Sequence, residues 1–397
     1  MTYLIKPRQY QIDAMKFIYR RKRVGLFFEM GTGKTKICVD FLAVMFQAEK
    51  IQKALIIAPL SGLGVWEDEI KKNAPQIQYQ FMRPGFVDWD ISHRQVIIVN
   101  YDYMRTHVQW LIGWHPDVVI LDESHKIKNP YARQSKTAHK LGQICDYAIC
   151  LTVTPIGNKP LDLWSQMKFL DSSVLDKTFK QFKEHYAVWI GYGRFQLKCY
   201  KNLKELGQRI SPYIKTLKKA DYLGLPPKNF ITVPVELDSN CREAYKSMEK
   251  DFILSLKDKN IIAPIVLAKL TKLCEITGGF ITDNEGKDIL LGTHKLDALL
   301  DLCNNLQESE VNRVVIYARF LWEINQIRDI LGRKWTTYRI SGEVKQPDRV
   351  LAERLFNNDG GVIICQIASG SIAINLQSAH HTIYYSLDYS LTNYLQS

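Results

Sequence analysis

A glycine-rich segment near the amino terminus has the residue types that bind phosphate. In FFEMGTGKT, at residues 27–35, Gly31 and Gly33 let backbone N–H groups close around phosphate oxygens. Lys34 can reach the outer phosphates of a nucleotide, and Thr35 can ligate magnesium. An apolar run precedes the segment and an amphipathic stretch follows it. The sequence therefore predicts a strand, a phosphate-binding loop and a helix in succession.

A second candidate lies about ninety residues further on, where an apolar run ends in two carboxylates. In VVILDESHKIKN, at residues 118–129, Asp122 and Glu123 follow that run directly. At the carboxyl edge of a parallel sheet, Asp122 can hold magnesium through water while Glu123 polarises the water that attacks a γ-phosphate. Two acids after a strand also serve as a helix-capping pair. Their position downstream of a phosphate-binding loop favours the magnesium and water site.

Short apolar runs separated by helix-length segments predict an α/β protein with two lobes. The runs lie at 24–30, 54–59, 96–100, 118–124 and 148–154, and again at 314–320, 337–342, 362–367 and 381–386. Strands that are apolar on both faces indicate parallel sheets covered on both sides. We expect a first lobe over 1–170, a basic helical insertion and connector over 171–228, and a helical protrusion with a second lobe over 229–397.

The charge of the chain favours a polyanionic partner. Lys and Arg number 53 against 41 Asp and Glu, which gives a net charge of +12. The segment 171–228 holds twelve of these basic residues and only five acidic ones. Lys198, Lys201 and Lys204 recur there at helical spacing, with Lys215, Lys218 and Lys219 nearby. Such a surface predicts contacts with a nucleic-acid backbone and little reading of base sequence.

Cysteine usage and hydropathy predict the compartment. The eight cysteines are scattered without a CxxC pair or metal-ligand spacing, which favours a reducing environment. No apolar run reaches the roughly 18 residues that a membrane span needs, and the first residues lack the apolar core of a secretory signal. We expect a cytoplasmic protein, or a nuclear one in a eukaryote, with no membrane partner.

Further segments carry a family resemblance. RQYQIDAM at 8–15 resembles an adenine-recognition motif, APLSGLGVWEDEI at 58–70 a motif Ia, and LTVTPIGNKPLDLWSQMKFL at 151–170 a motif III. DESHKIKN at 122–129 resembles motif II, and QIASGSIAINLQSAHHTIYY at 366–385 resembles motif V. Together with the phosphate-binding loop, they identify the chain as resembling the Swi/Snf branch of superfamily-two helicase-like ATPases. The compact chain is most similar to phage or bacterial members.

The resemblance implies two RecA-like P-loop lobes that bind ATP and Mg²⁺ in the cleft between them. It implies an ATP hydrolase that moves along double-stranded DNA, holds the DNA backbone across both lobes and remodels what is bound there. The ATP contacts implied are Gln11, Gly31, Thr32, Gly33, Lys34 and Thr35. The residues implied in DNA binding or in its coupling to ATP are Ser61, His125, Thr152, Thr154, Gly370, Asn375, Lys215, Lys218 and Lys219.

The last residues depart from the family pattern. Gln396 matches the first glutamine of motif VI, and the arginines that follow it in the family are absent. An arginine finger contributes about 10³–10⁵ to phosphoryl-transfer turnover, so we expect ATP binding with impaired hydrolysis. Two other functions remain open: a strand-separating helicase on forked DNA or RNA, and a nucleotide-gated scaffold for DNA or protein without turnover. A further tail or a protein partner would supply targeting.

Overall fold

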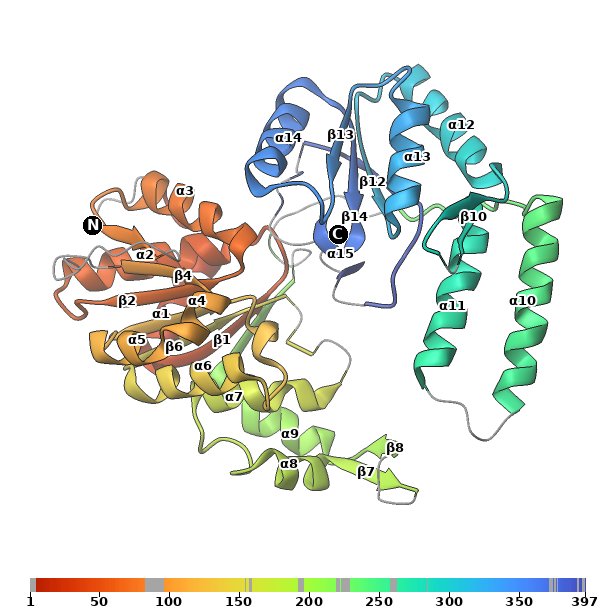
Figure 1. The fold of residues 1–397 in the computed structure, drawn as a ribbon. Coiled ribbons are helices and arrows are strands. Elements are labelled where there is room, and N and C mark those ends of the chain that lie inside the picture. The colour runs from red at the N-terminus through yellow and green to blue at the C-terminus, as the bar shows by residue number, and fades with distance from the viewer. Residues whose placement is uncertain are drawn as a thin grey trace. The chain divides into compact units, whose positions relative to one another are not determined.

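In the computed structural model the chain forms two compact units (Figure 1). The first is built mainly from Met1–Pro227 and the second mainly from Lys228–Leu395. The structure describes residues 5–82, 96–153, 155–156, 159–191, 196–218, 222, 229–257, 263–283, 285–370, 374, 376, 378–390, 393–394 and 397. No helix among these residues is long and apolar enough to cross a bilayer.

The first unit is organised around a parallel seven-stranded sheet. Its strands, in the order in which they pair, are β3 (Tyr79–Phe81), β4 (Val96–Asn100), β2 (Ala54–Ala58), β5 (Val118–Asp122), β6 (Tyr147–Leu151), β1 (Arg23–Phe28) and β9 (Ile214–Leu217). All neighbouring pairs are parallel. Five of these strands coincide with the apolar runs that predicted them, which confirms the α/β class.

Helices cover both faces of the first sheet, because alternate strand residues point to opposite sides (Figure 1). In β2, Ile56 packs into one apolar core and Leu55 into the other. The first core is closed by α1 (Gln9–Arg21), α2 (Lys34–Gln47) and α3 (Leu63–Asn73). The second is closed by α4 (Tyr101–Thr106), α5 (Val108–Trp114), α6 (Arg133–Ile144) and α7 (Leu163–Leu170).

The basic segment 171–228 contributes more to the first unit than a helical insertion would. It contains α8 (Phe179–Tyr186), the antiparallel pair β7 (Ala187–Ile190) and β8 (Gln196–Tyr200), and α9 (Leu203–Ile210). Its strand β9 then pairs with β1, Gly25 opposite Ile214. The helical spacing expected for Lys198, Lys201 and Lys204 is wrong, because Lys198 lies on β8 and only Lys204 lies on a helix. Hairpin pairing with β7 overrides the local periodicity.

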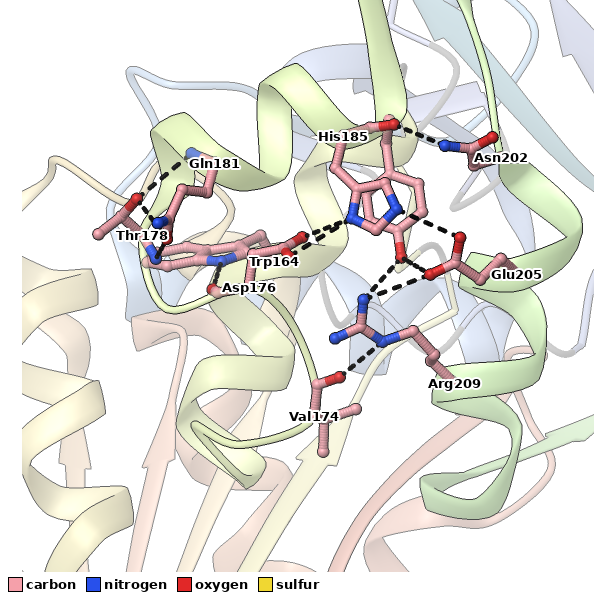
Figure 2. Close-up of polar contacts among 10 residues, drawn as sticks. Trp164, Val174, Asp176, Thr178, Gln181, His185, Asn202, Glu205 and Arg209 are labelled. Atoms are coloured by element: carbon pink, nitrogen blue, oxygen red, sulfur yellow. Dashed lines mark hydrogen bonds and ion pairs between the residues drawn. The ribbon is translucent and has the colours of Figure 1, made fainter.

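A polar network holds α8 and α9 to the segment that follows α7 (Figure 2). The two ring nitrogens of His185 lie 3.2 Å from carboxylate oxygens of Asp176 and Glu205, on either side of the ring. Arg209 donates from Nε to the Val174 carbonyl at 3.0 Å and from a guanidinium NH₂ group to the Tyr186 hydroxyl at 3.0 Å. The network therefore joins α8 to α9 and joins both helices to the segment that follows α7.

Replacing Arg209 with alanine should destabilise the first unit. The substitution removes the donors to the Val174 carbonyl and to the Tyr186 hydroxyl, which typically costs about 1–3 kcal/mol when the acceptors are partly buried. Thermal unfolding followed by circular dichroism should show a lower midpoint. Lys204→Ala, on the exposed surface of the same helix, is the control and should leave the midpoint nearly unchanged. Equal midpoints for the two variants would show that the network contributes little.

The second unit has its own parallel sheet, with β13 (Thr337–Ile340), β14 (Gly361–Gln366), β12 (Arg313–Ala318) and β15 (His381–Tyr384) paired in that order. Helices α12 (His294–Glu308) and α13 (Leu321–Leu331) close one core, and α14 (Gln346–Asp359) closes the other. The short helix α15 (Ile367–Gly370) follows β14. Ahead of this sheet, α10 (Ser239–Lys257) and α11 (Ala263–Thr277) lie side by side, and β10 (Phe280–Thr282) pairs with β11 (Asp288–Leu290) (Figure 1).

Candidate nucleotide site

The candidate site lies at the carboxyl edge of the first sheet. β1, β6 and β5 are consecutive neighbours there, and all three run in the same direction. Their carboxyl ends therefore bring three chain segments together: the glycine-rich loop after β1, Thr152 after β6, and the acids that end β5. Ligands bind at this edge in open α/β sheets.

The glycine-rich loop has a backbone shape that only glycine adopts without strain. Gly31 and Gly33 have φ angles of 72° and 74°. A Cβ on Gly33 would lie 2.6 Å from Nε2 of Gln11, so a side chain there would collide with α1 as well. Thr32 Oγ1 donates to the Glu29 carbonyl at 2.8 Å, and the buried Tyr10 hydroxyl donates to the Thr32 carbonyl at 2.9 Å. The loop is therefore preshaped as an anion-binding cradle.

Lys34 is turned onto its own loop. Its Nζ donates to the Phe28 carbonyl at 2.9 Å and to the Glu29 carbonyl at 3.3 Å. Burial acts to raise the pKa of both Asp122 and Glu123, and the positive charge of Lys34 acts against that rise. Lys34 begins α2 directly after the loop that follows β1, and Asp122 ends β5 at the same edge of the sheet. Their joint role in binding a nucleotide stays a prediction.

Three hydrogen bonds hold Asp122 in place. Its Oδ2 accepts a hydrogen bond from the indole Nε1 of Trp66 at 2.9 Å, and its Oδ1 accepts one from the Glu123 amide at 3.0 Å. The Tyr101 hydroxyl donates to the Asp122 backbone carbonyl at 2.7 Å. Burial and the adjacent charge of Glu123 raise the pKa of the Asp122 carboxyl to about 6. A divalent cation beside this carboxylate would offset both penalties.

Glu123 faces a second pair of polar side chains. Its Oε2 lies 3.1 Å from Nδ1 of His125 and accepts from Thr152 Oγ1 at 3.4 Å. His125 Nδ1 is also 3.3 Å from that hydroxyl, so the three side chains form a closed triangle. Burial would raise the pKa of Glu123, but the His125 contact and the Lys34 charge outweigh it and lower the pKa. Glu123 is therefore kept as a carboxylate, the form that a general base requires.

The remaining predicted residues lie at different places. Thr35 is in the first turn of α2, directly after Lys34. Ser61 lies in the short 3₁₀ turn after β2, and Gly370 ends α15 in the second unit. Lys215 lies on β9, with Lys218 just beyond its end. Thr154, Asn375 and Lys219 lie outside the described residues.

The structure adds residues that the sequence analysis did not assign to the site. Tyr10 supports the glycine-rich loop, Trp66 positions Asp122, and Tyr101 holds the strand end beneath the acids. Gln166 accepts from the buried hydroxyl of Ser124, immediately after the acids, at 2.8 Å. Tyr10 and Trp66 fall inside segments that the resemblance singled out, but their hydrogen bonds depend on how helices and strands pack.

A parallel sheet that carries this loop and these acids defines the P-loop class of proteins. Two sequence models of known protein families match the chain and show which family of P-loop proteins it belongs to. A model described as the SNF2-related domain matches residues 10–277, and one described as the helicase conserved C-terminal domain matches residues 294–397. The chain belongs to the SNF2-related family, which confirms the resemblance seen in its motifs.

Relatives of the chain come from plants and bacteria. A CHD3-type chromatin-remodeling factor of Arabidopsis thaliana is 26% identical over 413 residues, covering 96% of this chain and 33% of the relative. An ATP-dependent helicase of Mycoplasma pneumoniae is 28% identical over 401 residues, covering 96% of this chain and 37% of the relative. The chain thus spans about a third of the length of these relatives.

Solved structures agree with the fold. The SWI2/SNF2 ATPase core of Sulfolobus solfataricus in complex with dsDNA matches with a TM-score of 0.54 and 24% identity. The match covers 97% of this chain and 82% of that one. The same core solved as the ATPase core domain matches with a TM-score of 0.51. These matches confirm the two-lobe α/β fold that the sequence predicted.

Proposed function

We propose that this chain is the motor portion of an ATP-dependent translocase on double-stranded DNA. The observation that carries the proposal is the meeting of three groups at one sheet edge: the Lys34 ammonium, the Asp122 carboxylate and the Glu123 carboxylate. This set matches the needs of triphosphate hydrolysis, namely a cation for the phosphates, a ligand for a metal and a base for water. Family membership and the ATP-dependent helicase among the relatives support it.

The residues present fit a magnesium nucleotide. Gly31 and Gly33 give the loop positive φ angles, and the loop leads directly into the start of α2, where backbone N–H groups can bind phosphate. Asp122 and Thr35 supply the oxygen ligands that Mg²⁺ prefers. Bound Mg²⁺ would neutralise charge on the β- and γ-phosphates. We propose Gln11, whose Nε2 lies beside Gly33, for the contact with adenine that the family resemblance implies.

Each side chain would then have a defined part in hydrolysis. Lys34 would exchange its two carbonyl acceptors, on Phe28 and Glu29, for phosphate oxygens, which bear more charge. Glu123, kept ionised, would accept a proton from the attacking water. Because His125 and Thr152 both contact Glu123, a shift of the segment after β6 would change the position of the base. That triangle supports the coupling role proposed for His125 and Thr152.

Duplex DNA is the polymer we propose for this motor. The net charge of +12 and the concentration of lysines in residues 171–228 support backbone contacts. The Sulfolobus core of the same fold was solved with dsDNA, which supports a duplex over a single strand. In the first unit, Lys201, Lys204 and Lys218 are exposed and available to phosphates.

Binding to duplex DNA should weaken steeply as salt rises. Each phosphate contact releases counterions and adds about 0.9 to the slope of log affinity against log salt. Fluorescence anisotropy at several salt concentrations should give a slope of several units for the parent chain. Lys218→Gln should reduce the slope by about 0.9, and Lys72→Gln, an exposed lysine on α3, should not. A flat salt response would rule out backbone-dominated binding.

The ATPase rate measured without nucleic acid, with single strands and with duplex tests the proposed function. A duplex translocase predicts the highest rate with duplex. Higher stimulation by single strands would instead support a strand-separating helicase. Nucleotide binding without phosphate release under any condition, in this chain and in a longer version, would support a scaffold and contradict the proposal.

A further inference from the structure

Three potential metal ligands converge in the second unit, well apart in sequence from the nucleotide site. Asp238 immediately precedes α10, Cys241 lies in the first turn of α10, and His294 begins α12. One ligand atom from each side chain lies within 4.8 Å of the other two. The cluster thus joins the start of α10 to the start of α12.

Each ring nitrogen of His294 lies within hydrogen-bonding distance of an oxygen atom. Its Nε2 lies 3.3 Å from the carbonyl of Thr277, at the end of α11, and its Nδ1 lies 3.1 Å from Oδ2 of Asp238. A neutral imidazole carries only one N–H, so one of these nitrogens faces an oxygen with a lone pair. A cation beside Nδ1 and Oδ2 would be attracted to both atoms.

The Asp238 carboxylate is already held in place by the backbone. Its Oδ2 accepts from the amides of Thr293 and His294 at 2.9 and 3.2 Å, which fixes it over the start of α12. The side chain of Asp238 remains 41% exposed, whereas that of His294 is 5% exposed. The cluster is therefore buried on the side of His294 and exposed to water on the side of Asp238.

The thiol of Cys241 completes the cluster. Its side chain is fully buried, and no hydrogen bond to Sγ is found within the described part of the chain. A Cβ on Gly292 would lie 2.1 Å from Asp238 Oδ2 and 3.0 Å from Cys241 Sγ. Only glycine at position 292 lets these side chains approach each other beneath the start of α12.

We propose that Asp238, Cys241 and His294 bind a zinc-like transition-metal ion. A thiolate, an imidazole and a carboxylate are the ligand types that Zn²⁺ takes, and tetrahedral bonding places such ligand atoms about 3.3–3.6 Å apart. The 3.1 Å between His294 Nδ1 and Asp238 Oδ2 is close to that spacing. Water on the open side supplies the fourth ligand, and the thiol proton is released to solvent on binding.

The ion would act as a structural cross-link. The cluster lies where the start of α10, the end of α11 and the start of α12 meet. Binding to the folded state alone adds stability that grows with metal concentration. The proposal does not depend on ATP or DNA binding by the chain.

Cobalt(II) titration of the untagged full chain, in excess Mg²⁺, tests the site. Co²⁺ at the cluster should give one saturating equivalent, with a thiolate charge-transfer band in the near ultraviolet and visible bands typical of tetrahedral coordination. Zn²⁺ should displace it and raise the thermal midpoint. Absence of the thiolate band in the parent chain would overturn the proposal, whatever the variants do.

Matched variants assign the ligands. Cys241→Ser should abolish the thiolate band, and His294→Gln should weaken binding at least about tenfold. Cys303→Ser, at another fully buried cysteine on α12, is the control and should keep the full spectrum. Loss of the band in the control, or its retention in Cys241→Ser, would place the metal elsewhere and contradict the assignment. If Cys241→Ser does not fold, Asp238→Asn takes its place and should lower the affinity, because it removes one charge.

Discussion

Replacing Glu123 with glutamine is expected to slow ATP hydrolysis about 10²–10⁴-fold, the usual contribution of a general base. ATP affinity should change little, because the substitution keeps the shape of the side chain and leaves Lys34 and Asp122 in place. The physical reason is the state of Glu123, because its contact with His125 and the charge of Lys34 lower its pKa and keep it a carboxylate. Glutamine cannot accept the proton of the attacking water.

The measurement is phosphate release at saturating ATP and duplex DNA in a longer version of the chain that supplies the arginines of motif VI, together with equilibrium binding of a fluorescent ATP analogue. Glu49→Gln, an exposed glutamate just after α2, makes the same chemical change away from the site and is expected to keep the parent rate. Hydrolysis by the Glu123 variant within a few-fold of the parent would remove Glu123 from the role of base.

Replacing Lys34 with alanine is expected to weaken ATP binding about 10- to 100-fold. A hydrogen bond to a charged group contributes about 1.5–3 kcal/mol, and 1.4 kcal/mol corresponds to a factor of ten. Lys34 donates to the neutral carbonyls of Phe28 and Glu29, and charged phosphate oxygens are stronger acceptors than these carbonyls. The loss should appear in affinity for ATP far more than in affinity for adenosine.

Isothermal titration with ATP, and separately with adenosine, distinguishes these effects. Lys71→Ala removes an equal charge from the exposed face of α3 and should leave both affinities unchanged. Thermal unfolding without nucleotide checks that the Lys34 variant is folded. Unchanged ATP affinity in a folded Lys34 variant would contradict the assignment of the glycine-rich loop to phosphates.

Much of the fold follows from local pattern. The apolar runs predicted β1, β2, β4, β5 and β6 because a strand buried on both faces needs apolar residues at successive positions. β9 was not predicted, since Ile214–Leu217 is short and holds Lys215 within a basic segment. Its place is set by pairing with β1, a contact across nearly two hundred residues that no local pattern encodes.

Part of the candidate site could be predicted from the sequence, and part of it could not. Gly31, Gly33, Lys34, Asp122 and Glu123 were predicted because their chemistry depends on residue type and on their position after a strand. The hydrogen bonds of Trp66 to Asp122 and of Tyr10 to Thr32 were not predicted. They depend on the packing of α3 and α1 against the sheet, which brings distant residues together. Sharing of the nucleotide between lobes, which the resemblance implies, stays a prediction.

The cluster of Asp238, Cys241 and His294 is another feature that could not be predicted from the sequence. Scattered cysteines without a CxxC pair gave no sign of a metal site in the sequence. His294 and Cys241 are more than fifty residues apart, and they meet only because α10 and α12 begin at the same place in the second unit. Ligand spacing in sequence finds sites within one motif, not sites made by tertiary packing.

A crystal structure with Mg²⁺ and a non-hydrolysable ATP analogue tests the central claim most directly. The account predicts that the phosphates lie in the loop between Gly31 and Thr35, with Lys34 Nζ released from the Phe28 and Glu29 carbonyls and bound to phosphate oxygen. Mg²⁺ should then lie between Thr35 and Asp122. A triphosphate bound elsewhere, with Lys34 still on its own carbonyls, would contradict the account.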